Sequence, residues 1–223
     1  MSYSNGPPLR VVPEPVLKVG KAERTRAAIM DAALAFLWVR PFREMTVNAL
    51  MAGTGLSRSA YYQYFTDLHD LMRAVQDLIS VEIFSAAEPW VVGTGDPVAL
   101  VNESIAGMVR VGHQRGPFVR ALSDAATTDE VFEGAWNDFL GAFDEAATAV
   151  IEGDQQQGLI PKFDARPVAV ALNRLDASAL ITAFGQHPRE DPEAVCEALS
   201  RIWISTLYGG EWVGRGSSDL IRT

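Results

Sequence analysis

Residues 46–65, TVNALMAGTGLSRSAYYQYF, predict two short helices joined by a tight turn. Thr46 can cap the first helix through its side-chain hydroxyl, and Ser57 can cap the second in the same way. Between them, Gly55 supplies the left-handed backbone that a sharp turn requires. Leu56 is then placed to pack into the angle between the two helices. This arrangement of cap, turn and cap is the pattern of a helix-turn-helix.

The second of these helices is predicted over residues 58–64, and most of its side chains carry hydroxyl, amide or guanidinium groups. A short helix of this composition has little reason to lie in a hydrophobic core. Its groups suit a DNA groove, where they can meet phosphates and base edges. The alternative is a surface helix with three tyrosines, of the kind that interaction proteins carry.

The flanking sequence makes residues 23–71 resemble the DNA-binding domain of TetR-family transcriptional regulators. The matching features are an entry helix over residues 24–39, the step Met45-Thr46-Val47, the turn Gly55-Leu56-Ser57-Arg58, then Tyr62, Tyr64-Phe65 and Leu71. The resemblance implies an all-α protein, with a helix-turn-helix head and a helical-bundle body, that binds a palindromic DNA operator as a homodimer.

The resemblance and the side-chain chemistry together predict DNA contacts from the first helix, the turn and the start of the fourth helix. The predicted contacts are Lys21, Arg24, Arg26, Thr46, Ser57, Arg58, Ser59, Tyr61, Tyr62, Gln63, Tyr64 and His69. Members of the family usually have a lysine where Leu68 stands, and that lysine touches a phosphate. Either His69 or backbone amides at the start of the helix would have to replace it here.

The charge of the chain is unevenly distributed. Residues 1–65 carry 8 Lys and Arg against 4 Asp and Glu, a net charge of +4, whereas the remainder carries 11 against 24, a net charge of −13. A basic head can meet phosphates while an acidic body stays soluble and is repelled from DNA. Ordinary scatter of charges is the alternative interpretation.

Prolines, glycines and helical periodicity divide the chain into four parts. These are a mobile arm over residues 1–20, the head over residues 21–70, the body over residues 71–210 and a loose tail over residues 211–223. Arg10 and Lys18 in the arm could reach DNA, although a solvated arm is the simpler interpretation. The body is expected to break at residues 89–95, which mark its seam with the head, and again at Gly116-Pro117, which gives about nine helices in all.

Two polar residues, Asn173 and Asp176, lie one turn apart on an otherwise apolar body helix. Such groups need partners, which are either neighbouring protein groups or a ligand in an apolar pocket. Residues 171–184 and 202–209 resemble the EthR type of TetR repressor, in which an apolar channel runs through the body. The resemblance implies a small apolar effector and these pocket residues: Met108, Trp136, Phe139, Phe143, Asn173, Asp176, Phe184 and Trp203.

Asp176 departs from the EthR type, which has an amide at this position. A carboxylate favours a ligand that carries a hydrogen-bond donor or a positive charge. The alternative is that Asp176 pairs internally with Arg174 or Arg120 and takes no part in binding.

Other classes of function find little support in the sequence. No nucleophile elbow, phosphate loop or dinucleotide fingerprint is present, and the three histidines lack metal-ligand spacing, so no enzyme activity, cofactor or metal is expected. No uncharged run approaches the ~20 residues that cross a bilayer. A single cysteine, Cys196, is compatible with a reducing cytoplasm.

The last two helices, residues 166–186 and 192–208, are apolar on more than one face, which predicts a homodimer interface. The sequence therefore favours a dimeric, ligand-responsive repressor. An activator or dual regulator of the same family, or a helical ligand-binding or interaction protein without DNA binding, remains the alternative.

Overall fold

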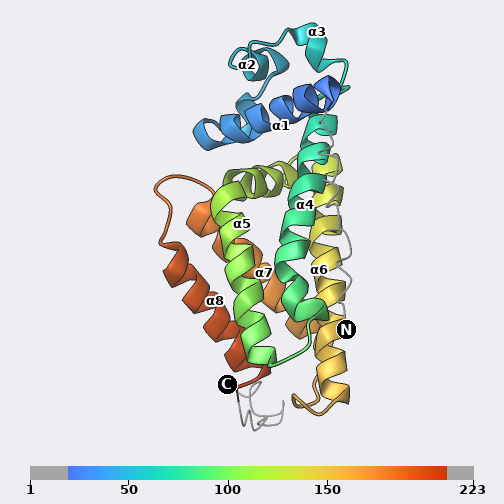
Figure 1. Cartoon of the computed structure of the whole chain (residues 1–223), viewed down its shortest axis with the longest axis vertical. Helices are drawn as coiled ribbons and strands as arrows, with labels where there is room; N and C mark the ends of the chain where they lie inside the picture. The colour runs from blue at the N-terminus through green and yellow to red at the C-terminus, as the bar shows by residue number, and fades with distance from the viewer. Residues whose placement is uncertain (1–19, 210–223) are drawn as a thin grey trace, which may run out of the picture.

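The computed structural model describes residues 20–209, and within them the all-α prediction is confirmed: the elements are eight α-helices and one 3₁₀-helix (Figure 1). The elements are α1 (Lys21–Val39), η1 (Phe42–Glu44), α2 (Val47–Met51), α3 (Arg58–Tyr61), α4 (Leu68–Val92), α5 (Pro97–Ala126), α6 (Glu130–Gln156), α7 (Ala165–Phe184) and α8 (Pro192–Leu207). The predicted arm, with Arg10 and Lys18, and the predicted tail lie outside the described residues, except for Gly20.

The first three helices form a head at one end of the molecule, and α4 leads from the head into an elongated body (Figure 1). Within the body α4 packs on both α5 and α6, while α7 packs on α5 and α6. The last helix, α8, packs chiefly against α5 and makes a smaller contact with α7. One flank of the body is thus formed by α8, far from the head's helical turn.

Two hydrophobic cores hold the fold together. The first joins the head to the near end of the body, because Ile29 and Leu71 belong to the same buried cluster as Phe118 and Phe132. The second lies deeper in the body and includes Trp203. Full burial of a side chain such as Phe118 contributes about 1.5–3 kcal/mol to stability. The head is therefore packed against the body and does not hang from a flexible linker.

The predicted break at Gly116-Pro117 is wrong, because α5 continues through both residues as one helix, which Figure 1 shows as a bent ribbon. Pro117 has no N–H to donate to the carbonyl of His113, one turn earlier. The Nη1 of Arg189 donates to that carbonyl at 2.9 Å instead. Because this long-range donor satisfies the freed carbonyl, one long helix replaces two shorter ones, and eight α-helices replace the expected nine.

The break expected at Pro89 is also displaced, since α4 runs on to Val92 before it ends. A buried hydroxyl from α5 supports this last turn. Ser104 Oγ accepts the N–H of Trp90 at 2.9 Å and donates to the carbonyl of Ala87 at 3.1 Å. In both long helices, tertiary contacts override the local tendency of proline to end a helix.

Candidate nucleic-acid interface and ligand cavity

The helical turn in the head forms as its residues predict. Thr46 accepts the N–H of Ala49 at 3.1 Å and Ser57 accepts the N–H of Ala60 at 3.1 Å, so each hydroxyl caps its helix. Gly55 has a φ of 69°, the left-handed conformation that glycine adopts without strain. Each capping hydroxyl keeps its own proton, which remains available to a phosphate oxygen.

The second helix, α3, is shorter than predicted and ends at Tyr61, after which the chain makes a turn. Its polar surface is nevertheless in place: Ser57, Arg58, Ser59, Tyr62 and Gln63 are all exposed, and Tyr64 is half-buried. Arg58 is held in position by Tyr62, since its Nη2 donates to the Tyr62 hydroxyl at 3.2 Å and its guanidinium lies 5.5 Å from the ring centroid. A positioned guanidinium loses less conformational freedom on binding.

The prediction that Tyr61 contacts DNA is corrected by the structure. Its side chain is fully buried, and its hydroxyl donates to the carbonyl of Asp67 at 2.7 Å. It is part of the head core and does not reach the surface. Among the predicted basic contacts, Lys21, Arg24 and Arg26 are exposed on the first turns of α1. The guanidinium of Arg26 lies 5.2 Å from the centroid of the Phe65 ring, which places it beside the helical turn.

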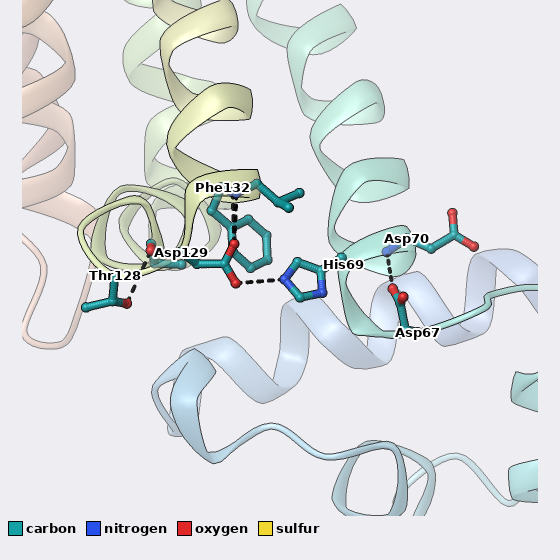
Figure 2. Close-up of polar contacts among 8 residues, drawn as sticks. Asp67, His69, Asp70, Thr128, Asp129 and Phe132 are labelled. Atoms are coloured by element: carbon teal, nitrogen blue, oxygen red, sulfur yellow. Dashed lines mark hydrogen bonds and ion pairs between the residues drawn. The ribbon is translucent and has the colours of Figure 1, made fainter.

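His69 also departs from the prediction, because it faces the body (Figure 2). Its Nε2 lies 2.8 Å from Oδ2 of Asp129, the N-cap of α6, and its ring stacks on Phe132 with centroids 4.8 Å apart. The His69 hydrogen bond, with help from the backbone amides at the start of α6, holds the pKa of Asp129 below its usual value. The amide of Asp70 is likewise taken, by Oδ1 of Asp67. His69 thus joins the head to the body, while the Asp67 cap occupies the Asp70 amide at the start of α4.

Two small cavities adjoin inside the body, with volumes of about 40 and 60 Å³. Met108, Phe143 and Asn173 line both of them. Ligand pockets usually have volumes of ~300–1,000 Å³. A ligand of ordinary size would therefore have to move side chains, and the flexible Met108 at the junction is suited to do so.

Six of the eight predicted pocket residues line these cavities: Met108, Phe139, Phe143, Asn173, Asp176 and Trp203. The other two do not. Trp136 stacks on Phe139 and packs against the head-side core, and Phe184 is fully buried where it contacts Gly116. In the structure both side chains pack in the hydrophobic cores and line neither cavity.

The polar partners inside the body differ from those considered for Asp176. Arg174 pairs with Asp144 through Nη1 at 3.1 Å and Nη2 at 2.8 Å, and Arg120 bonds to Asp124 and Gln186. Both carboxylate oxygens of Asp176 instead share the indole N–H of Trp203, each at 3.0 Å. Burial raises the pKa of Asp176 to about 7, a rise that the Trp203 hydrogen bond reduces.

Sequence reasoning missed Asp144, which is buried and accepts a hydrogen bond from Nδ2 of Asn173 at 3.0 Å. The signal was its spacing, because Asp144 falls on the same helical face as the apolar residues Leu140, Ala147 and Ile151. An acidic residue at such a position requires a partner inside the protein.

An open groove of about 660 Å³ separates part of the head from the body. Its walls include Trp38 and Arg43 on the head side, and Arg120 and His187 on the body side. Phe132 and Asp129 also line this groove, so it lies beside the packed contact that they make with His69.

Within residues 20–209, no cluster of His, Cys, Asp or Glu is arranged to hold a metal ion. In the same part of the chain, no helix is both long and apolar enough to cross a membrane.

Comparison with known proteins gives concordant results. Residues 101–209 match the family described as the C-terminal domain of the transcriptional regulator EthR. The chain is 25% identical over 191 residues to the HTH-type transcriptional regulator EthR of Mycolicibacterium smegmatis, covering 84% of this chain and 88% of that protein. It is 25% identical over 186 residues to EthR of Mycobacterium tuberculosis, covering 82% and 86%.

The fold is similar to that of NalD, the secondary repressor of the MexAB-OprM multidrug efflux pump in Pseudomonas aeruginosa. That match has a TM-score of 0.67 with 18% sequence identity, and it covers 85% of this chain and 100% of the NalD chain.

Proposed function

We propose that this chain, which belongs to the TetR family of transcriptional regulators and to the EthR type within it, is a dimeric repressor released from its operator by a small ligand. The observation that carries the proposal is the exposed polar face of the helical turn, with Arg58 positioned by Tyr62, next to the basic start of α1. Occupation of an operator by two such heads would block transcription until a ligand weakens binding.

Replacement of Arg58 by Ala is expected to weaken binding to the operator by roughly 5- to 150-fold, the effect of the ~1–3 kcal/mol that a good guanidinium–base contact supplies. If Arg58 contacts a phosphate instead, the loss of affinity should be similar on all duplexes. The slope of log affinity against log salt concentration should then become shallower by about one. Fluorescence anisotropy with labelled operator and unrelated duplexes, at several salt concentrations, separates these results. Arg110→Ala, an exposed arginine on α5, is the control. Unchanged operator affinity in the Arg58 variant would exclude this face from binding.

The dimer interface is proposed on the outer faces of α7 and α8, which carry small or uncharged exposed residues: Ala171, Ser178, Thr182, Ala194, Ala198 and Ile202. The residues Leu199 and Leu207 face the protomer's own core and are 3% and 2% exposed. Charges there would unfold the protomer, so they cannot test the interface.

Ile202→Asp is expected to convert the dimer to a monomer at micromolar concentration, because a two-fold axis would bring two buried carboxylates together. Sedimentation velocity measures the change. Val131→Asp on α6, where the native side chain is 50% exposed, is the matched control and should leave the dimer intact. A dimer that survives Ile202→Asp would place the interface elsewhere.

The ligand cavity and the head are proposed to be coupled through α6. Phe139 and Phe143 on this helix line the cavity, while Phe132 near its start stacks on His69 and meets the ring of Phe42 edge-on at 5.2 Å. A ligand that displaces Phe139 and Phe143 would move the start of α6, and with it the head, through the contact of His69 with Asp129 and Phe132 (Figure 2). The groove beside the head leaves room for that movement.

His69→Asn is expected to leave DNA affinity without ligand within about threefold, while it removes most of the ligand's weakening of DNA binding, typically ~1–3 kcal/mol of coupling. The measurement is operator binding with and without ligand. If release by ligand were as strong as in the native protein, coupling would have to pass through other contacts.

A further inference from the structure

Asp176 is a buried carboxylate that has no cationic partner among residues 20–209. Its side chain belongs to a residue 6% exposed, and within residues 20–209 its one hydrogen-bond donor is the indole N–H of Trp203, shared between both oxygens. A carboxylate can accept about four hydrogen bonds, so most of its capacity is unused. The neighbouring polar residue in the cavity, Asn173, directs its amide N–H to Asp144.

The second buried carboxylate of the body provides a contrast on the same helices. Asp144 receives two N–H groups from Arg174 and one from Asn173, so its charge is compensated by the protein. Asp176 receives no such cation, and it lines the cavity. A buried charge without a counter-charge is costly, and a cation placed in the cavity would relieve that cost.

The walls of the cavity fit the same kind of ligand. Apart from Asn173 and Asp176, its lining residues are apolar, and Phe139 and Phe143 present aromatic rings that can also stabilise a cation. The adjoining cavity continues past Met108 towards Trp90 and offers an apolar path for a chain. Among the residues that the structure describes, no other titratable group lines the cavity that holds Asp176.

We propose that the effector of this cavity is an elongated apolar amine whose protonated nitrogen pairs with Asp176, so that Asp176 determines the ligand's charge. The inference rests on the proposed function, in which this cavity is the effector site. The inference narrows the chemical class of that effector from any small apolar molecule to a cationic amphiphile.

The test compares three probes of equal chain length, n-octylamine, n-octanol and n-octanoate, by calorimetric titration of the full-length protein at pH 8. The amine is expected to bind at least roughly tenfold more tightly than the alcohol, since a hydrogen bond to a charged group is stronger than a neutral one. Octanoate should bind weakest. Asp176→Asn should abolish the preference for the amine while keeping affinity for the alcohol, because the amide oxygen can still accept the Trp203 N–H.

Equal affinities of amine and alcohol for the native protein would overturn the inference, and this comparison does not depend on the variant. If the alcohol still bound and released operator DNA in that case, the effector site itself would stand. An amine preference that persists in Asp176→Asn would also overturn the inference, because the charge would then be read by another residue. Binding by none of the three probes would overturn both the inference and the proposed effector site. It would not affect the proposal that the head binds DNA, which is tested by a separate measurement.

Discussion

Gly116→Ala is expected to destabilise the protein by about 3 kcal/mol and to lower its melting temperature by roughly 10 °C. A Cβ at this position would lie 2.4 Å from the carbonyl oxygen of Phe184 and 2.6 Å from its carbonyl carbon. Both atoms belong to the backbone at the end of α7, so no side-chain rotation can relieve the overlap. The helices α5 and α7 would have to separate, and the core around Phe184 would open.

The matched control is Gly141→Ala on α6, where a Cβ would meet nothing within 4 Å. Alanine is the better helix former by up to about 1 kcal/mol, so this variant should be slightly more stable than the native protein. Differential scanning calorimetry measures both. Equal melting temperatures for the two variants would show that α5 and α7 do not approach as closely as described.

Asp176→Asn is expected to be more stable than the native protein at pH 8, by on the order of 2–4 kcal/mol, with the difference vanishing towards pH 4. Burial raises the pKa of Asp176 to about 7 from an ordinary value of 3.8. Between these values the unfolded chain has lost the proton that the folded chain keeps, so native stability falls as the pH rises. Above pH 7 the folded protein carries an unpaired buried charge. Asparagine does not titrate and avoids this loss.

Denaturant unfolding from pH 4 to pH 8 tests this dependence. Asp144→Asn is the control, since it removes a carboxylate that Arg174 and Asn173 already stabilise and should therefore lower stability at pH 8. If the native protein and Asp176→Asn showed parallel pH profiles, Asp176 would be neutralised by a contact absent from the structure.

The head was predictable because its structure depends on local interactions. Thr46, Gly55 and Ser57 act within a few residues of themselves, so their types and spacing are sufficient to predict the turn. The exposure of the polar side chains on and beside α3 was predictable for the same reason, apart from that of Tyr61. One tyrosine among three neighbours must supply the core beneath a short helix, and the sequence does not indicate which one.

The other errors occurred where a partner lies far along the chain. Arg189 compensates for Pro117, and Asp129, 60 residues from His69, draws that histidine towards the body. Similarly, Asp176 is bonded by Trp203 and not by Arg174 or Arg120, the two partners considered from the sequence. Each pairing depends on how the helices cross, which periodicity does not specify. Asp176 was recognised as unusual because a charge on an apolar face is visible without knowledge of its partner.

The central claim is sequence-specific DNA binding by the head, and footprinting on the DNA that flanks this protein's own gene tests it most directly. The expected result is a protected segment with two-fold symmetry that is lost as the salt concentration rises and is absent with Arg58→Ala. No protected segment at low salt, or protection that is unaffected by salt, would contradict the claim.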